Sequence, residues 1–197
     1  MAAALQRHEL GVTWIEQSRT TRTAHALVSD GRVWLIDPFD DRPALEAAAS
    51  LGHPEGVLQL LDRHNRDCRP IAARLGVPLM RLPERLPDTP FAVVPVMSRW
   101  GWNEIALWWA EAQALIVAEA IGTAPAFALG RRAGIHPVLR LTPPRSQFAG
   151  YRPKVLLVGH GSTIEYDAAT ALDEALAHSR SDIPRLLLDL PKLLRGG

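Results

Sequence analysis

The sequence is poor in cysteine and in long apolar runs. Among 197 residues Cys68 is the only cysteine, so no intramolecular disulfide can form and a reducing compartment is expected. No apolar run reaches the ~18 residues of a membrane span. Residues 1–10 include Arg7, His8 and Glu9, where a signal peptide would have an apolar stretch. We therefore expect a cytoplasmic protein with no membrane partner.

A charge excess is also lacking. The formal net charge is +1, which gives no strong field toward nucleic acid or an anionic membrane. Four tryptophans lie close together in the chain, but no basic stripe accompanies them, so a nucleic-acid stacking surface is not predicted. Alternation along a strand puts Trp108 and Trp109 on opposite faces. One is expected in the core, and the other under a helix or at a homodimer contact.

Turn residues and apolar patterns predict strands that alternate with helices. Asp30-Gly31 between two apolar runs indicates a hairpin, and Gly52 is a typical end for an alanine-rich helix. The predicted strands are 11–16, 25–29, 32–36, 56–61, 77–82, 91–96, 104–109, 114–119 and 154–158. The predicted helices are 42–51, 71–75, 124–133, 137–141, 167–179 and 183–194. No repeat or linker divides the chain, so residues 1–197 are expected to form a single layered α/β domain.

Four stretches, in this order, carry a resemblance to a known family. They are the hairpin Ala24–Asp37, the strand Ala114–Gly122, the run Gly130–Arg145 and the strand Val155–Gly161 with its Gly-His-Gly turn. Across roughly residues 23–180 the chain resembles the metallo-β-lactamase superfamily. The resemblance implies an α/β fold built as an αββα four-layer sandwich, in which two packed sheets have helices outside.

The family's main metal motif, His-x-His-x-Asp-His, is expected after a buried strand. Residues 63–68 occupy this place, with Arg63 and Asn65 at the first two histidines, Asp67 at the aspartate and Cys68 at the last histidine. Outside the motif, the resemblance sets Trp100 at the next ligand histidine, Glu119 at the bridging aspartate and His160 at the final histidine. Arginine stays protonated and tryptophan offers a metal no lone pair. The three-histidine zinc site should therefore be absent.

The second half of the motif keeps better ligands. Carboxylate, thiolate and imidazole all bind zinc, so Asp67, Cys68 and His160 are candidate ligands for one zinc, with Glu119 as a weaker fourth. Asp67 would then be the catalytic candidate. Structural roles stay open for each of them: a buried thiol at Cys68, a helix cap at Asp67, a hydrogen-bonded turn at His160 and an ion pair at Glu119.

Arginines around the motif suggest a different kind of site. Arg63 and Arg66 precede a helix, whose N-terminus favours anions, and Asn65 and Trp100 would line the same pocket. An ion-pair network of Arg66, Asp67 and Glu119 that merely fills the old site is the structural alternative.

Two functional hypotheses follow. The first is a non-catalytic member of the fold that binds a small molecule or small anion. The alternative is a mononuclear metal-dependent hydrolase that uses Asp67, Cys68 and His160.

Overall fold

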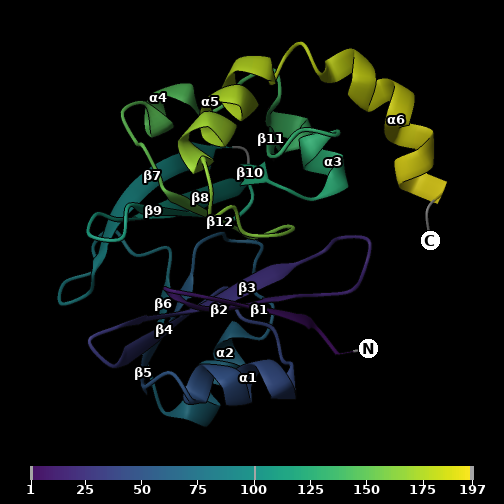
Figure 1. Cartoon of the computed structure of the whole chain (residues 1–197). Coiled ribbons are helices and arrows are strands. Elements are labelled where there is room, and N and C mark those ends of the chain that lie inside the picture. Colours follow the sequence, from purple (N-terminus) through teal and green to yellow (C-terminus); the bar gives the residue numbers. More distant parts are fainter. Residues whose placement is uncertain (1, 100, 196–197) are drawn as a thin grey trace.

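Two β-sheets lie face to face, with helices on both outer sides, in the computed structural model, which describes residues 2–99 and 101–195 (Figure 1). The first sheet has the order β1-β2-β3-β4-β5-β6, and α1 and α2 cover its outer face. Its elements are β1 (Ala4–His8), β2 (Gly11–Ile15), β3 (Thr23–Ser29), β4 (Arg32–Ile36), α1 (Arg42–Ala49), β5 (His53–Gln59), α2 (Cys68–Leu75) and β6 (Leu79–Arg81).

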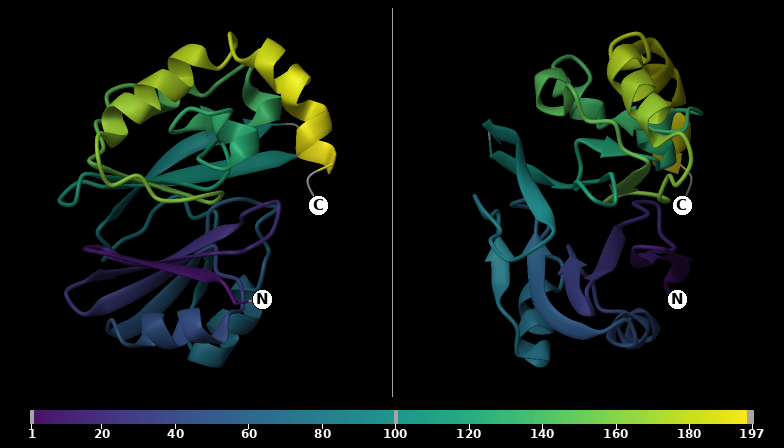
Figure 2. Two further views of the ribbon diagram at one scale, coloured as in Figure 1. Left: turned by 45° about the vertical axis from the view of Figure 1, so that its right-hand side comes forward. Right: turned by 60° about the vertical axis from the view of Figure 1, so that its left-hand side comes forward.

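The second sheet has the order β12-β9-β8-β7, and α3, α4 and α5 lie on its far side (Figures 1 and 2). Its strands are β7 (Phe91–Arg99), β8 (Trp102–Trp109), β9 (Ala114–Val117) and β12 (Val155–Val158), and a short ribbon pairs β10 (Ile121–Gly122) with β11 (Gly134–Ile135). The helices are α3 (Pro125–Ala128), the 3-10 turn η1 (Pro137–Leu139), α4 (Arg145–Phe148), α5 (Ala168–His178) and α6 (Ile183–Arg195). The predicted αββα sandwich is confirmed.

Strand direction brings the ends of several strands together. The β3–β4 hairpin turns at Asp30 and Gly31, both with positive φ, as a type I′ turn requires. Next, β4 and β5 pair in parallel, and so do β9 and β12. Parallel strands end at the same edge of their sheet, so the segments after these four strands are neighbours. Those segments carry the polar residues of the candidate site.

The core follows the alternation of each strand. In β4, Val33 and Leu35 pack against the helices, whereas Trp34 and Ile36 lie between the sheets. There the Trp34 ring meets Phe91 edge-on, with ring centroids 5.5 Å apart. A strand with one polar face can lie with that face in water. Because β4 is apolar on both faces, it is stable only where helices cover one face and the second sheet covers the other.

Several local features differ from the predictions: the predicted helix 137–141 is the 3-10 turn η1, and β10, β11 and α4 were not predicted. The strand β1 was not predicted, because it lies at the edge of its sheet and most of its side chains are exposed or half-buried. Helix α3 is only four residues long, since Leu129 and Gly130 both have positive φ and end it. Helix α2 begins at Cys68, three residues earlier than predicted. In the part of the chain that is described, no helix is long and apolar enough to cross a membrane.

Candidate metal centre

Three side chains that could hold a metal ion meet where β5, β9 and β12 end. His64 follows β5, Glu119 follows β9 and His160 follows β12. One ligand atom of each lies within 4.8 Å of the other two. His64 is buried, and the other two are half-buried. The parallel pair β9 and β12 brings Glu119 and His160 together, and His64 comes from the first sheet, so the cluster joins residues up to 96 positions apart.

The hydrogen bonds of the two histidines fix their tautomers. His64 Nδ1 lies 2.9 Å from Asp37 Oδ2, and His160 Nδ1 lies 2.7 Å from the Thr20 carbonyl oxygen. A carbonyl or carboxylate oxygen only accepts, so both Nδ1 atoms carry a proton, and in a neutral ring each Nε2 atom then keeps a lone pair. Metal-bound histidines are typically held in this way. Burial also lowers the pKa of His160 to about 4, so its ring is neutral at pH 7.

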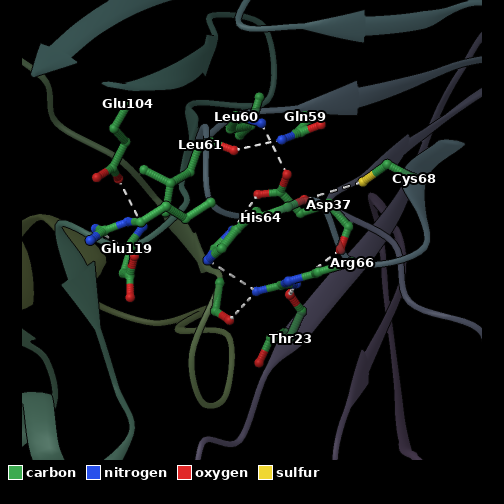
Figure 3. A network of polar contacts seen from close by, with 12 residues as sticks. Thr23, Asp37, Gln59, Leu60, Leu61, His64, Arg66, Cys68, Glu104 and Glu119 are labelled. Atoms are coloured by element: carbon green, nitrogen blue, oxygen red, sulfur yellow. Dashed lines mark hydrogen bonds and ion pairs between the residues drawn. The ribbon is translucent and has the colours of Figure 1, made fainter. Parts of the chain in front are cut away.

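Arg66 places a half-buried cation beside this cluster (Figure 3). Its Nη1 donates to the carbonyls of Thr23 and Asp37, at 2.5 and 2.9 Å. Its Nη2 donates to the Gly159 carbonyl at 3.1 Å and lies 3.4 Å from His64 Nε2. Burial lowers the pKa of Arg66, but a guanidinium starts so high that it stays charged. Arg66 therefore donates three hydrogen bonds to backbone carbonyls, and its guanidinium lies beside His64.

Donors also surround the Glu119 carboxylate. Arg63 Nη2 lies 3.3 Å from Glu119 Oε2, and the Arg63 guanidinium lies 4.1 Å from the Trp102 ring centroid. His136 Nε2 lies 3.6 Å from Glu119 Oε1. Because His136 Nδ1 accepts from the backbone N–H of Val138, its proton is on Nε2 and points toward the carboxylate. Burial lowers the pKa of His136 to about 4, so this donor is a neutral ring at pH 7.

Behind Glu119, a second carboxylate holds the backbone. Glu104 is buried, and its Oε1 accepts from the N–H groups of Glu119 and Ala120, each at 2.8 Å. Its Oε2 accepts from Trp102 Nε1 at 2.8 Å. Burial raises the pKa of Glu104 to about 7 despite these bonds. Its role is to position the segment that carries Glu119.

Solved structures of metallo-β-lactamases have the same arrangement of elements. The DIM-1 metallo-β-lactamase aligns over 94% of this chain and 98% of its own, with a TM-score of 0.58 and 12% identity. The chain has the metallo-β-lactamase fold. VMB-1 covers 91% of this chain and 97% of its own at a TM-score of 0.62 and 11% identity. The alignment with the BLEG-1 B3 metallo-β-lactamase covers 76% of this chain and 91% of that protein, with a TM-score of 0.50 and 14% identity. No sequence family and no curated protein matches the chain.

Within the metallo-β-lactamase fold, the segment after β5 lies one residue out of the predicted register. The side chains of His64 and Arg66 point into the site. Asp67 instead accepts the backbone N–H of Asp40 at 2.8 Å, and Cys68 Sγ faces the carbonyls of Pro38 and His64.

The structure therefore separates the predicted ligands. His160 and Glu119 lie in the cluster, but Asp67 and Cys68 do not. Cys68 is buried, which raises the pKa of its thiol to about 12, and its Sγ faces the carbonyls of Pro38 and His64 and not the cluster. The residues that the structure brings together are His64, Glu119 and His160.

The remaining predicted residues have other surroundings. Asn65 is exposed, and its Oδ1 lies 3.3 Å from Gln59 Nε2. Trp100 lies outside the described residues. Arg63 pairs with Glu119 at the rim, whereas Arg66 is committed to backbone carbonyls. Of the two arginines predicted to bind an anion, only Arg63 has an exposed side chain, at 49%.

Sequence reasoning missed His64 and His136. The signal for His64 was available: Asp37 ends β4 and His64 follows β5, so two parallel strands deliver both to one edge. For His136 no sequence signal exists. It reaches Glu119 only through the β10–β11 ribbon, where Gly122 pairs with Gly134.

Proposed function

We propose that this protein binds one divalent transition metal, such as zinc, through His64, Glu119 and His160, and uses it as a hydrolytic centre. The observation that carries the proposal is the pair of fixed tautomers. Asp37 and the Thr20 carbonyl hold the two rings so that both Nε2 lone pairs are free of protons next to the Glu119 carboxylate.

The donor set fits such a metal. Two imidazoles and a carboxylate are usual zinc ligands, and three protein ligands with one open position are the usual count of a catalytic site. Ligand atoms around a tetrahedral zinc are about 3.3 Å apart, so the ligand atoms of the cluster, which lie up to 4.8 Å apart, have to approach one another by up to about 1.5 Å. When bound in this way, the metal lowers the pKa of its water and supplies a hydrolytic nucleophile.

The arginines limit and define the centre. Arg66 is a fixed positive charge next to His64, and it opposes a second cation there, so the proposal is for one metal and not two. Arg63 lies at the rim with a half-exposed side chain. It is placed to bind an anionic group of a substrate, while His136 Nε2 lies 3.6 Å from Glu119 Oε1.

A metal-free binding protein is the second candidate, and the contacts of Arg66 and Arg63 favour it. Arg66 Nη2 lies 3.4 Å from His64 Nε2, and Arg63 pairs with Glu119. Two of the three metal donors thus already have a cationic partner. In this alternative Arg63 and Arg66 supply the positive charge that a metal would otherwise supply, and the protein binds a ligand without hydrolysing it.

Metal titration separates these functions. The protein is purified without metal-affinity resin, treated with a chelator, dialysed and titrated with Zn²⁺ by calorimetry. We expect one equivalent to bind, and His64→Ala and His160→Ala to abolish binding. Cys68→Ala is the matched control, because the thiol lies beside the cluster without belonging to it, and it should bind like the wild type.

Each other outcome has a clear meaning. Less than about a tenth of an equivalent in the wild type would refute the metal centre and leave the metal-free candidate, since a site with three ligands retains its metal. Binding that is lost in Cys68→Ala but kept in His64→Ala would instead restore the predicted trio of Asp67, Cys68 and His160.

A further inference from the structure

A cavity of about 850 Å³ opens along the edge strand β7. Its walls come from the second half of β7, the start of β8, the segment 142–147 that includes the start of α4, and Arg180 between α5 and α6. Figure 1 shows α4 above this end of the second sheet. None of the three residues of the metal cluster lines it. The cavity is thus a separate feature, of the volume that small-molecule sites have.

The lining combines an apolar wall with arginines from three elements. The apolar part consists of Leu82, Pro95, Val96, Met97, Ile105, Pro143 and Pro144. The arginines are Arg99 of β7, Arg145 of α4 and Arg180. The single acidic residue of the lining, Glu104, already accepts two backbone N–H groups and an indole N–H. The charge on the cavity wall is therefore positive.

Two of these arginines are held in place without an acidic partner. Arg145 Nη2 donates to the Leu176 carbonyl at 2.9 Å, and Arg180 Nε donates to the Leu141 carbonyl at 3.0 Å. Among residues 2–99 and 101–195, no carboxylate lies within 4.0 Å of either guanidinium. Carbonyl anchors fix the direction of both side chains and leave their charge uncompensated. Such a pair is suited to an external anion.

We propose that this cavity binds a small organic anion, with its carboxylate, sulfonate or phosphate group on Arg145 and Arg180 and its apolar body against the β7 wall. The cavity is larger than an inorganic ion, and such an ion would leave the apolar part of the wall without a contact. The two arginines set the charge of the ligand, and Val96, Met97 and Ile105 set its apolar character.

Calorimetry with a matched pair of probes tests the proposal. Naphthalene-1-sulfonate is the anionic probe, and 1-naphthalenemethanol is its uncharged counterpart. We expect the intact protein to bind the sulfonate at least tenfold more tightly than the alcohol, and raised NaCl to weaken the sulfonate alone. Arg180→Gln and the double variant with Arg145→Gln should lower sulfonate affinity tenfold or more. Arg42→Gln, an exposed arginine paired with Glu46 on the opposite layer, is the matched control.

Folding and location are checked in the same experiment. Arg145 also ties down the end of α5, so Arg180→Gln, with circular dichroism of each variant, keeps the test valid if the double variant unfolds. Equal affinity for the two probes, or sulfonate binding that Arg180→Gln leaves unchanged, would overturn the proposal. Loss of binding in Arg63→Gln instead would place the anion at the metal centre and would also overturn it. Zinc binding is measured in parallel, so failure of the cavity is distinguishable from failure of the metal centre.

Discussion

His25 joins the two sheets through a neutral ring, and this makes stability depend on pH. It lies in β3 with 2% exposure. Its Nε2 donates to the Val158 carbonyl of β12 at 3.1 Å, and its Nδ1 accepts from the Thr13 hydroxyl at 2.7 Å. Burial lowers the pKa of His25 to about 3, whereas an unfolded chain restores a value near 6.5.

The sign and size of the effect follow from these two values. Since the pKa is depressed in the folded state, the stabilisation is complete above pH 6.5 and is lost as the pH falls from there toward 3. Between pH 8 and pH 5 only the unfolded chain takes up the proton. At 1.36 kcal/mol per pKa unit, the free energy of unfolding should drop by about 2 kcal/mol over this interval because of His25.

Urea unfolding at the two pH values, followed by tryptophan fluorescence, measures this loss. His25→Gln keeps a donor and an acceptor but cannot titrate, so its stability should fall by about 2 kcal/mol less than that of the wild type. His53→Gln, at an exposed position, is the control and should behave like the wild type. Equal losses in His25→Gln and the wild type, or an imidazole NMR signal of His25 that titrates near pH 6 in the folded protein, would refute the reasoning.

Three further predictions concern the site and the core. Asp37→Asn turns one of the two carboxylate oxygens, which face the Leu60 N–H and His64 Nδ1, into an NH2 donor, so one of these two bonds is lost; zinc affinity measured by calorimetry should fall about 10- to 100-fold, and an unchanged affinity would contradict this role. Cys68, buried and with its pKa raised to about 12, should not react with a thiol-specific disulfide reagent at pH 8 until urea unfolds the protein; rapid labelling of the native state would disprove it. Leu107→Ala, in the core between the sheets, should cost about 2–5 kcal/mol in urea unfolding, whereas Leu188→Ala at a 77% exposed position should cost little; similar losses would contradict the assigned core.

The order of elements and the layered class were readable in the sequence, because local patterns determine both. Asp30-Gly31 specifies a turn whose φ values few other residue pairs adopt, and the apolar run in β4 identifies a strand with both faces covered. Where the local signal is weak, prediction failed. Edge strand β1 buries too little to show alternation, and α3 ends at Leu129, a residue with no intrinsic preference for positive φ.

The metal centre was a matter of tertiary structure. The sequence alone indicated that the three-histidine motif was rewritten and that Glu119 and His160 follow strands that end at the expected place. It left the register of the segment after β5 undetermined, since a shift by one residue exchanges every side chain that points inward. Only the fold decided that His64 and Arg66 enter the site, through the bond to Asp37 on the parallel neighbour β4 and three carbonyls on separate segments. Such contacts depend on strand pairing across the chain, and no local pattern contains them.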